Sequence, residues 1–184
     1  MHSLHAPAPA APIACRHTRR VWLAVTTLLL FGQVLALPMQ AGAGTTAATR
    51  AELDTFERSA LIIESAGKRL PFKVWLADTA ARREQGLMFV RQLPANSGML
   101  FLFPAAVNTA FWMKNTFIPL DLLFIRRDGS IARIAARARP HDLTPIPSGE
   151  PILAVLELAG GTTALLGVQV GDQVLSPALH PARE

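Results

Sequence analysis

The chain has 184 residues, which is enough for one domain and a short additional segment. Its 18 lysines and arginines against 13 acidic residues give a formal net charge of +5 at pH 7. Because three arginines and no acidic residue lie in residues 1–43, the remainder holds 15 basic and 13 acidic residues, a net charge of +2. A charge this small gives no support to nucleic-acid binding, and no nucleic-acid partner is expected.

The N-terminal segment has the composition of a secretory signal peptide. Three arginines precede the apolar run VWLAVTTLLLFGQVLAL, and small residues follow it. This pattern predicts a signal peptide over residues 1–43, cleaved after Ala43 or, as a second candidate, after Ala36. The chain is therefore expected to be periplasmic or secreted, with the general and twin-arginine export routes both open. An uncleaved leader would be its only contact with a membrane.

After the leader, composition predicts one folded domain between two short flexible segments. Residues 44–58 begin with small and polar side chains and are expected to form a flexible lead-in. A single β-rich domain is expected over residues 59–176, followed by a loose tail over residues 177–184. No internal repeat or heptad pattern is present, and the protein is expected to be a monomer.

Two strands and a short helix are predicted at the start of this domain. FERSALIIE (56–64) predicts a strand, and KRLPFKVWLA (68–77) alternates apolar and polar residues as a half-buried strand does. The dipeptide at 78–79, Asp-Thr, can cap a short helix that stops at Gly86. Among the charged residues of this helix, Arg83 is the candidate for a functional role.

The central stretch predicts three strands in succession. GMLFLF (98–103) is a continuous apolar run, typical of a strand that is buried on both faces. It is expected to stop at Phe103, because Pro104 has no N–H to donate to a neighbouring strand. A second strand is expected over residues 109–117, and LDLLFI (120–125) predicts a third.

The second of these strands places an aromatic ring beside a cation. Alternation divides it into two faces, with Phe111, Met113, Asn115 and Phe117 on one and Trp112, Lys114 and Thr116 on the other. Trp112 next to Lys114 offers an apolar plate and a positive charge, which suits a sugar or a carboxylated ligand. Asn115, among apolar neighbours, is either a turn or bulge residue or a polar wall of a site. An ion pair between Lys114 and Asp121 is an equally consistent alternative.

The C-terminal half predicts a hairpin, a long loop and one further strand. Asp128-Gly129 marks a turn that folds SIARIAARAR back against the third central strand. Arg133, Arg137 and Arg139 are expected on one face, as a solvated edge or, alternatively, as a docking patch for an anionic envelope component. Residues 140–151, with four prolines, predict a long ordered loop. ILAVLELA (152–159) predicts a strand, a helical segment follows it, and VGDQVL (170–175) is expected to close the domain.

Several kinds of chemistry are absent from the sequence. It has no phosphate-binding glycine loop, no Ser-His-Asp signature and no HExxH. The only cysteine, Cys15, lies in the leader. The only histidines after the leader are His141 and His180, so no metal site from cysteine or histidine is expected. Three methionines could form a soft copper site, but they are more typical of core filling: Met88, Met99 and Met113. No cofactor is expected.

One pair of carboxylates has catalytic potential. Asp121 and Glu157 each stand alone in an apolar strand, and on adjacent strands they could act as acid and base if held ~5–10 Å apart. An apolar setting would raise one pKa, as acid catalysis requires. The alternative is that both are paired structurally, Asp121 with Lys114 and Glu157 with an arginine.

Seven short blocks occur in order along the chain: REQGLMFVR, GMLFLF, FWMKNTFIPLDLLFI, RDGS, PSGEP, VLELAGG and VGDQV. Together they resemble the domain of unknown function 192 family over residues 70–175. The resemblance implies a mainly β, compact sandwich or barrel-like domain of jelly-roll character with one or two short helices. The family's polar pattern falls on Arg83, Trp112, Lys114, Asn115, Asp121 and Glu157. The resemblance to this family implies no activity.

These observations lead to three hypotheses. The first is non-catalytic binding of an envelope-associated small ligand, a saccharide or an anionic molecule, by the six polar residues named above. The second is a hydrolase or lyase that uses Asp121 and Glu157. The third is an envelope protein-interaction module that acts through the arginine-rich strand. An enzyme is the less favoured of these classes.

Overall fold

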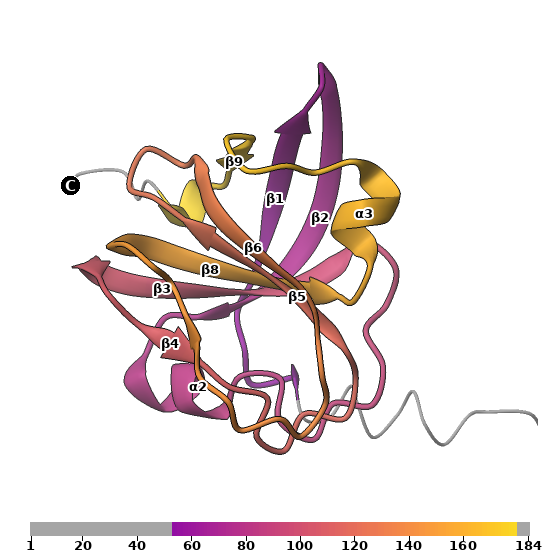
Figure 1. Ribbon diagram of the computed structural model, residues 1–184, viewed down its shortest axis with the longest axis vertical. Coiled ribbons are helices and arrows are strands. Elements are labelled where there is room, and N and C mark those ends of the chain that lie inside the picture. Colours follow the sequence, from indigo (N-terminus) through magenta and orange to yellow (C-terminus); the bar gives the residue numbers. More distant parts are fainter. Residues whose placement is uncertain (1–52, 180–184) are drawn as a thin grey trace, which may run out of the picture. The chain divides into compact units, whose positions relative to one another are not determined.

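One curved seven-stranded sheet forms the framework of residues 53–179, the part of the chain that the computed structural model describes (Figure 1). Its strand order is β6-β5-β8-β3-β2-β1-β9. The strands are β1 (Arg58–Ser65), β2 (Lys68–Ala77), β3 (Ser97–Val107), β5 (Leu120–Ile125), β6 (Ile131–Ala138), β8 (Ile152–Ala159) and β9 (Gln173–Leu175). The predicted leader with its cleavage sites, Cys15 and His180 lie outside the described residues.

Five smaller elements accompany the large sheet in the described part. A two-stranded sheet joins β4 (Ala110–Phe111) to β7 (Ile146–Pro147). The helices are α2 (Ala80–Gln85), α3 (Thr162–Leu166) and the 3-10 helix η1 (Pro177–Leu179). No helix within residues 53–179 combines the length and the apolar character needed to cross a membrane.

The two edges of the large sheet meet at one end. Ser130 forms an isolated β-bridge with Gln173. Beside it, the Ile131 N–H donates to the Asp172 carbonyl at 2.9 Å, and the Val174 N–H donates to the Gly129 carbonyl at 2.9 Å. These contacts curl the sheet into a half-barrel (Figure 1). The prediction of a mainly β, barrel-like fold with one or two short helices is confirmed.

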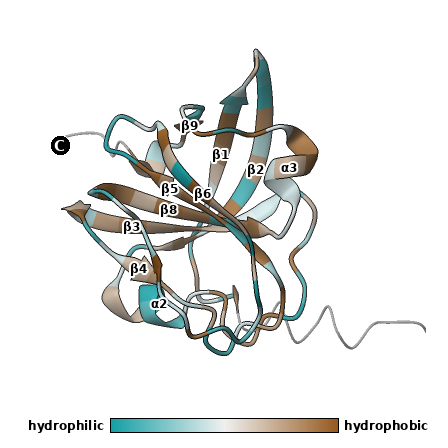
Figure 2. Cartoon of the chain, viewed as in Figure 1, coloured by the Kyte–Doolittle hydropathy of each residue, from teal (hydrophilic) through white to brown (hydrophobic). Residues whose placement is uncertain are grey.

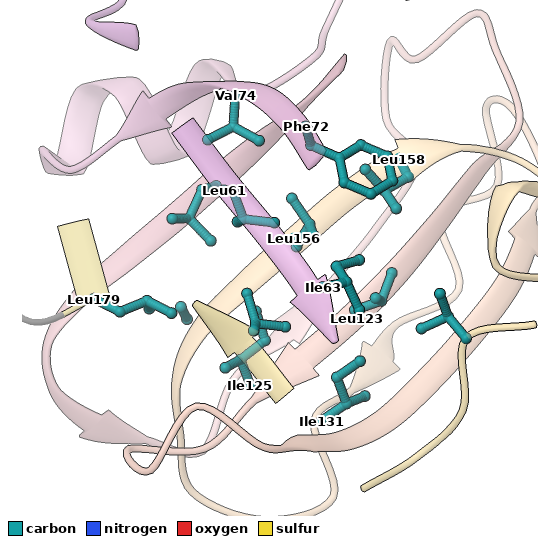
Figure 3. Packing of buried hydrophobic residues seen from close by; sticks show 14 of the residues in the cluster. Leu61, Ile63, Phe72, Val74, Leu123, Ile125, Ile131, Leu156, Leu158 and Leu179 are labelled. Atoms are coloured by element: carbon teal, nitrogen blue, oxygen red, sulfur yellow. The ribbon is translucent and has the colours of Figure 1, made fainter. Parts of the chain in front are cut away.

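The curled sheet has apolar side chains on both faces. The inner core takes residues from all seven strands, among them Leu61, Val74 and Leu156 (Figure 3). The outer core covers the opposite face of β2, β3, β5 and β8, with Phe101 and Phe124 among its members. Because both faces are covered, β3, β5 and β8 are rich in hydrophobic residues along their length (Figure 2).

The expected stop of the first central strand at Phe103 is wrong. Strand β3 continues through Pro104 to Val107. Its pairing with β8 shifts register between Leu102 and Val107, so Pro104 lies in an irregular stretch. A residue without an N–H is tolerated there because the regular hydrogen-bonding ladder is already interrupted.

The expected strand over residues 109–117 is also largely wrong. Only Ala110–Phe111 is a strand, and it pairs with β7 inside the loop that was predicted to contain no strand. Asn115 adopts a left-handed conformation with φ of 54°, and the Thr116 N–H donates to the Met113 carbonyl at 3.2 Å. Asparagine tolerates this conformation and favours a turn, so the alternation of faces ends before it.

The arginines of β6 do not share one face. The pairing of β5 with β6 shifts register twice, and Arg137 has a φ of 51° at the second shift. Arg133 lies over the Phe124 ring on the outer face, with 5.4 Å from the guanidinium carbon to the ring centroid. Bulges of this kind redirect side chains, and a strict two-residue period misses them.

The two flexible segments that the sequence predicts are packed at their described ends. Leu53 and Phe56, within the expected lead-in, are buried in the outer core. Leu179, within the expected tail, is buried in the inner core and lies in η1. In both segments, isolated apolar residues among small ones provide the packing.

Candidate functional site

A pocket of about 320 Å³ opens on the outer face of the sheet. Its buried floor comes from β3 and β8, one wall from α2 and the residues after it, and the other wall from residues 109–116. The lining residues are Arg83, Glu84, Gln85, Gly86, Met88, Phe101, Phe103, Thr109, Ala110, Phe111, Trp112, Lys114, Thr116 and Glu157. The mouth of the pocket consists of the exposed Glu84, Trp112 and Lys114 and the half-buried Arg83.

Helix α2 is positioned by both of its ends, as the sequence predicts. The Thr79 hydroxyl oxygen accepts from the Arg82 N–H at 3.2 Å, which caps the first turn. Gly86 ends the helix with φ of 50°, and its N–H donates to the Arg82 carbonyl at 2.9 Å. A Cβ on Gly86 would lie 3.1 Å from Cζ of Phe101. This close approach brings the end of the helix onto the pocket floor.

Arg83 is the arginine of α2 that lines the pocket. Its guanidinium donates to the carbonyls of Asp78 at 2.7 Å and Leu102 at 2.8 Å, and it lies over the Phe103 ring. The neighbouring Arg82 instead pairs with the Asp78 carboxylate at 2.8 Å. Arg83 therefore brings a positive charge to the pocket in an orientation that backbone carbonyls fix.

Trp112 and Lys114 lie together at the mouth. Trp112 is 53% exposed, and Nζ of Lys114 is 5.5 Å from the centroid of its ring. A cation over an aromatic face is held electrostatically without losing its charge. The pair presents the apolar plate and the positive charge that the sequence predicts, although a turn and not a strand supplies it.

Glu157 is the buried acid of the pocket floor. It lies in β8, where its register partners are Met99 on β3 and Leu122 on β5, both in the outer core. Burial raises the pKa of Glu157 to about 8, so the carboxyl is mainly neutral at pH 7. Among residues 53–179, none forms a salt bridge with this carboxyl, and no hydrogen bond contributes to its pKa shift.

Asp121 lies on the other face of the sheet. Its Oδ1 accepts from the N–H groups of Arg137 and Gly161 at 2.8 and 2.9 Å. Its Oδ2 accepts from the Thr163 N–H and hydroxyl at 2.8 and 2.7 Å. Burial alone would raise the pKa of Asp121, but the bonds from Gly161, Thr163 and Arg137 outweigh it and hold the pKa below its ordinary value. This carboxylate fixes α3 to the sheet.

The structure brings together four of the six polar residues that the sequence singled out, namely Arg83, Trp112, Lys114 and Glu157. Asp121 pairs in register with Leu158 of the inner core, so it and Glu157 point to opposite faces. Asn115 does not line the pocket; its carbonyl accepts from the Phe89 N–H at 2.8 Å, and its side chain lies near the Met88 sulfur.

The aromatic lining of the pocket was missed by the sequence argument. The Phe101 and Phe111 rings meet edge to face with centroids 5.0 Å apart, and Phe111 meets Phe124 in the same manner. In the sequence these residues read as core, and they are mostly covered by protein. Phe101 and Phe111 also line the pocket, because it opens between α2 and β4.

The described residues offer no obvious metal centre. Within 53–179, no three side chains of His, Cys, Asp or Glu gather closely enough to hold an ion. His141 is exposed and packs edge to face on Phe117, with ring centroids 5.0 Å apart. The methionines Met99 and Met113 are buried in the outer core.

Comparisons with known proteins identify the kind of chain but no activity. The family model DUF192, described as "Uncharacterized ACR", matches residues 61–176. A solved structure from Sinorhizobium meliloti 1021, of a protein proposed to be a transcription regulator, is 42% identical with a TM-score of 0.65; the match covers 66% of this chain and 95% of that one. A protein of unknown function from Novosphingobium aromaticivorans DSM 12444 is 42% identical with a TM-score of 0.62, covering 63% of this chain and 83% of that one. No curated protein matches.

Proposed function

The chain belongs to the domain of unknown function 192 family, and from that premise we propose that it is an exported, non-catalytic protein that binds a small envelope-associated ligand, a saccharide or an anionic molecule. The observation that carries the proposal is the convergence of Arg83, Trp112, Lys114 and Glu157 on one pocket. These residues come from three separate segments of the chain and have no common structural task.

The composition of the pocket suits such a ligand. Trp112 offers an exposed ring on which a sugar can stack, and Lys114 holds a positive charge beside it. Arg83 adds a second cation, and Phe101 and Phe111 supply apolar walls. Small-molecule sites commonly combine an apolar lining with a few converging polar groups.

The envelope location of the ligand is part of this proposal. It is supported by the basic, apolar and small-residue pattern of residues 1–43, which is typical of a secretory signal peptide. A periplasmic or secreted protein would meet cell-wall sugars and small organic acids there.

A hydrolase or lyase with two catalytic carboxylates is the less favoured alternative. Such chemistry needs both groups in one solvent-reachable cleft. Asp121 is fully buried and accepts four hydrogen bonds from the protein on the face away from Glu157. Binding by the pocket requires no such pair.

The proposal is tested by a thermal-shift screen of the purified protein against sugar acids, the matching neutral sugars and small organic acids. A ligand present at a hundred times its dissociation constant is expected to stabilise the fold by about 2.7 kcal/mol. Trp112→Ala and Lys114→Ala should each remove most of that shift without lowering the melting temperature of the free protein, since both residues are exposed.

Two exposed residues outside the pocket provide matched controls. Leu165→Ala removes an exposed apolar side chain from α3, and Lys68→Ala removes an exposed lysine from the start of β2. Both variants should keep the full ligand-induced shift. A hit that survives Trp112→Ala and Lys114→Ala unchanged would show that the pocket is not the binding site.

A further inference from the structure

The floor and the mouth of the pocket differ in charge, and this difference restricts which molecules can bind. We propose that the pocket takes a small N-acylated sugar acid, or a molecule of the same polarity, with its neutral amide or hydroxyl group against Glu157 and its carboxylate at Lys114. The inference rests on the proposed binding function and specifies the ligand class and its orientation.

The floor favours a neutral polar group. Glu157 is 5% exposed, and none of the described residues contributes a hydrogen bond or a charge to the shift of its pKa. Glu157 lines the pocket, so a bound ligand can supply a hydrogen-bond partner to its carboxyl group. In its neutral form a carboxyl group donates one hydrogen bond and accepts another, which matches an amide or a hydroxyl and does not match a carboxylate.

The mouth favours a negative charge. Arg83 and Lys114 line the pocket as cations, and Glu84 is the one acid beside them. Among the described residues, Lys114 forms no salt bridge, and its ammonium group lies over the ring of Trp112. It can therefore still donate to a ligand. A carboxylate that binds here stays partly in water, which lowers its desolvation cost.

The size of the pocket favours one sugar ring. A volume of about 320 Å³ lies at the lower end of the range of roughly 300–1,000 Å³ for small-molecule sites. The apolar face of a pyranose ring can stack on Trp112 while its substituents reach the floor and the mouth. Longer saccharides would have to continue into solvent.

The proposal makes binding depend on the protonation of Glu157. The charged groups that face it are Arg83 and Glu84 from α2 and Lys114 from the turn after β4. Arg133 of β6, on the same face of the sheet, lies over Phe124. Neither Arg83 nor Lys114 neutralises Glu157, since burial is the sole cause of its raised pKa. Ionisation at higher pH would place a negative charge against the ligand and weaken binding.

Isothermal titration calorimetry with two probes, N-acetylmuramic acid and N-acetylglucosamine, tests both ends of the site at pH 7 and pH 9. With the pKa of Glu157 at about 8, the affinity of the unmodified protein for both sugars should fall by about 10-fold between these pH values. Glu157→Gln, which mimics the neutral acid, should bind both sugars equally well at pH 7 and pH 9.

The mouth is tested with Lys114→Gln. This variant should bind the acid no more tightly than the neutral sugar, and it should keep the 10-fold pH effect. Lys68→Gln is the control, because it removes an exposed lysine outside the pocket and should change neither the pH effect nor the preference for the acid.

The outcomes separate this inference from the proposed function. If Glu157→Gln loses affinity at pH 9 as the unmodified protein does, or if the acid is not preferred over the neutral sugar, the orientation is wrong and the binding function stands. If neither sugar binds at pH 7 while another compound of the screen does, the ligand class is wrong. If no compound of the screen binds, both proposals fall.

Discussion

Two buried acids on neighbouring strands, Asp121 of β5 and Glu157 of β8, have opposite environments. Asp121 accepts four hydrogen bonds on the inner side of the sheet, and these hold its pKa below the ordinary value despite burial. Glu157 lies between the outer-core residues Met99 and Leu122 at the floor of the pocket, and burial raises its pKa to about 8. Both sit as single charges in apolar strands, so sequence alone treats them as equivalent.

The difference shows how a structural acid is distinguished from a candidate site residue. An acid that the fold uses is fully satisfied by the protein, and its charged form is favoured. An acid that lines a pocket without partners costs stability, and such a cost is commonly found at functional sites. This contrast between Asp121 and Glu157 can be tested through folding stability, without any ligand.

The largest effect is expected from Asp121→Ala. It would leave the N–H and hydroxyl of the buried Thr163 and the half-buried N–H groups of Arg137 and Gly161 without their acceptor. Each unsatisfied buried group costs about 1–3 kcal/mol, so the free energy of unfolding should fall by roughly 3–5 kcal/mol in urea denaturation. Asp142→Ala is the control, because this loop carboxylate accepts from the Thr144 N–H at the surface, and its loss should cost much less stability than that of Asp121.

The contribution of Asp121 should also disappear at low pH. Its folded-state pKa lies below the ordinary 3.8, so the unfolded chain binds its proton first as the pH falls. The stability that Asp121 provides is therefore present above about pH 4 and is lost below it. An acid denaturation curve that is the same for Asp121→Asn and the unmodified protein would contradict this role.

Glu157→Gln should act in the opposite direction and stabilise the protein. The folded-state pKa of about 8 lies above the ordinary 4.5, so between these values the folded protein holds a proton that the unfolded chain has lost. The free energy of unfolding should then fall as the pH rises across this window, by about 1.4 kcal/mol per pH unit. Glutamine has no proton to lose, so its advantage should reach up to about 3 kcal/mol at pH 7 and be small at pH 5.

Urea denaturation at pH 5, 6, 7 and 8 measures this slope directly. Glu64→Gln is the matched control, since Glu64 lies on the surface and pairs with an exposed Arg69. Its effect should stay within about 0.5 kcal/mol at each pH. A Glu157→Gln variant that is less stable than the unmodified protein at pH 7 would mean that the carboxyl has a partner in the fold.

Much of the sheet could be predicted from the sequence because its strands have simple patterns. The limits of β2, β5 and β8 agree with their apolar or alternating runs, and α2 agrees with its cap and its stop. The errors lie at the bulges of β3 and β6 and in the turn at Asn115, where an extra residue or a left-handed backbone breaks the period of two. Local patterns carry no signal for such shifts.

The candidate site could be predicted in part, where its residues are neighbours in the sequence. Trp112 and Lys114 are neighbours in sequence, and their closeness survives the change from strand to turn. The separation of Asp121 from Glu157 depends on which face each strand presents, and a one-residue change of register reverses it. The pocket itself depends on the separation between α2 and β4, which is set by the tertiary structure and has no local sequence signal.

The smallest of these effects is expected from Gly86→Ala, which tests how firmly α2 is placed over the floor. Gly86 has φ of 50°, and a Cβ there would lie 3.1 Å from Cζ of Phe101. Gly149 has φ of 83° and nothing within 4 Å of a built Cβ. Alanine is strained at either position because φ is positive, but only at Gly86 must a ring of the pocket move as well.

The difference between the two variants therefore isolates the contact between helix and floor. Gly86→Ala should lose about 1 kcal/mol more than Gly149→Ala, because Phe101 is buried and packs edge to face on Phe111. It should also weaken binding of any ligand of the pocket, whereas Gly149→Ala should not. Equal losses of stability would mean that α2 yields easily, and the pocket would then be shaped by its ligand and not by the fold.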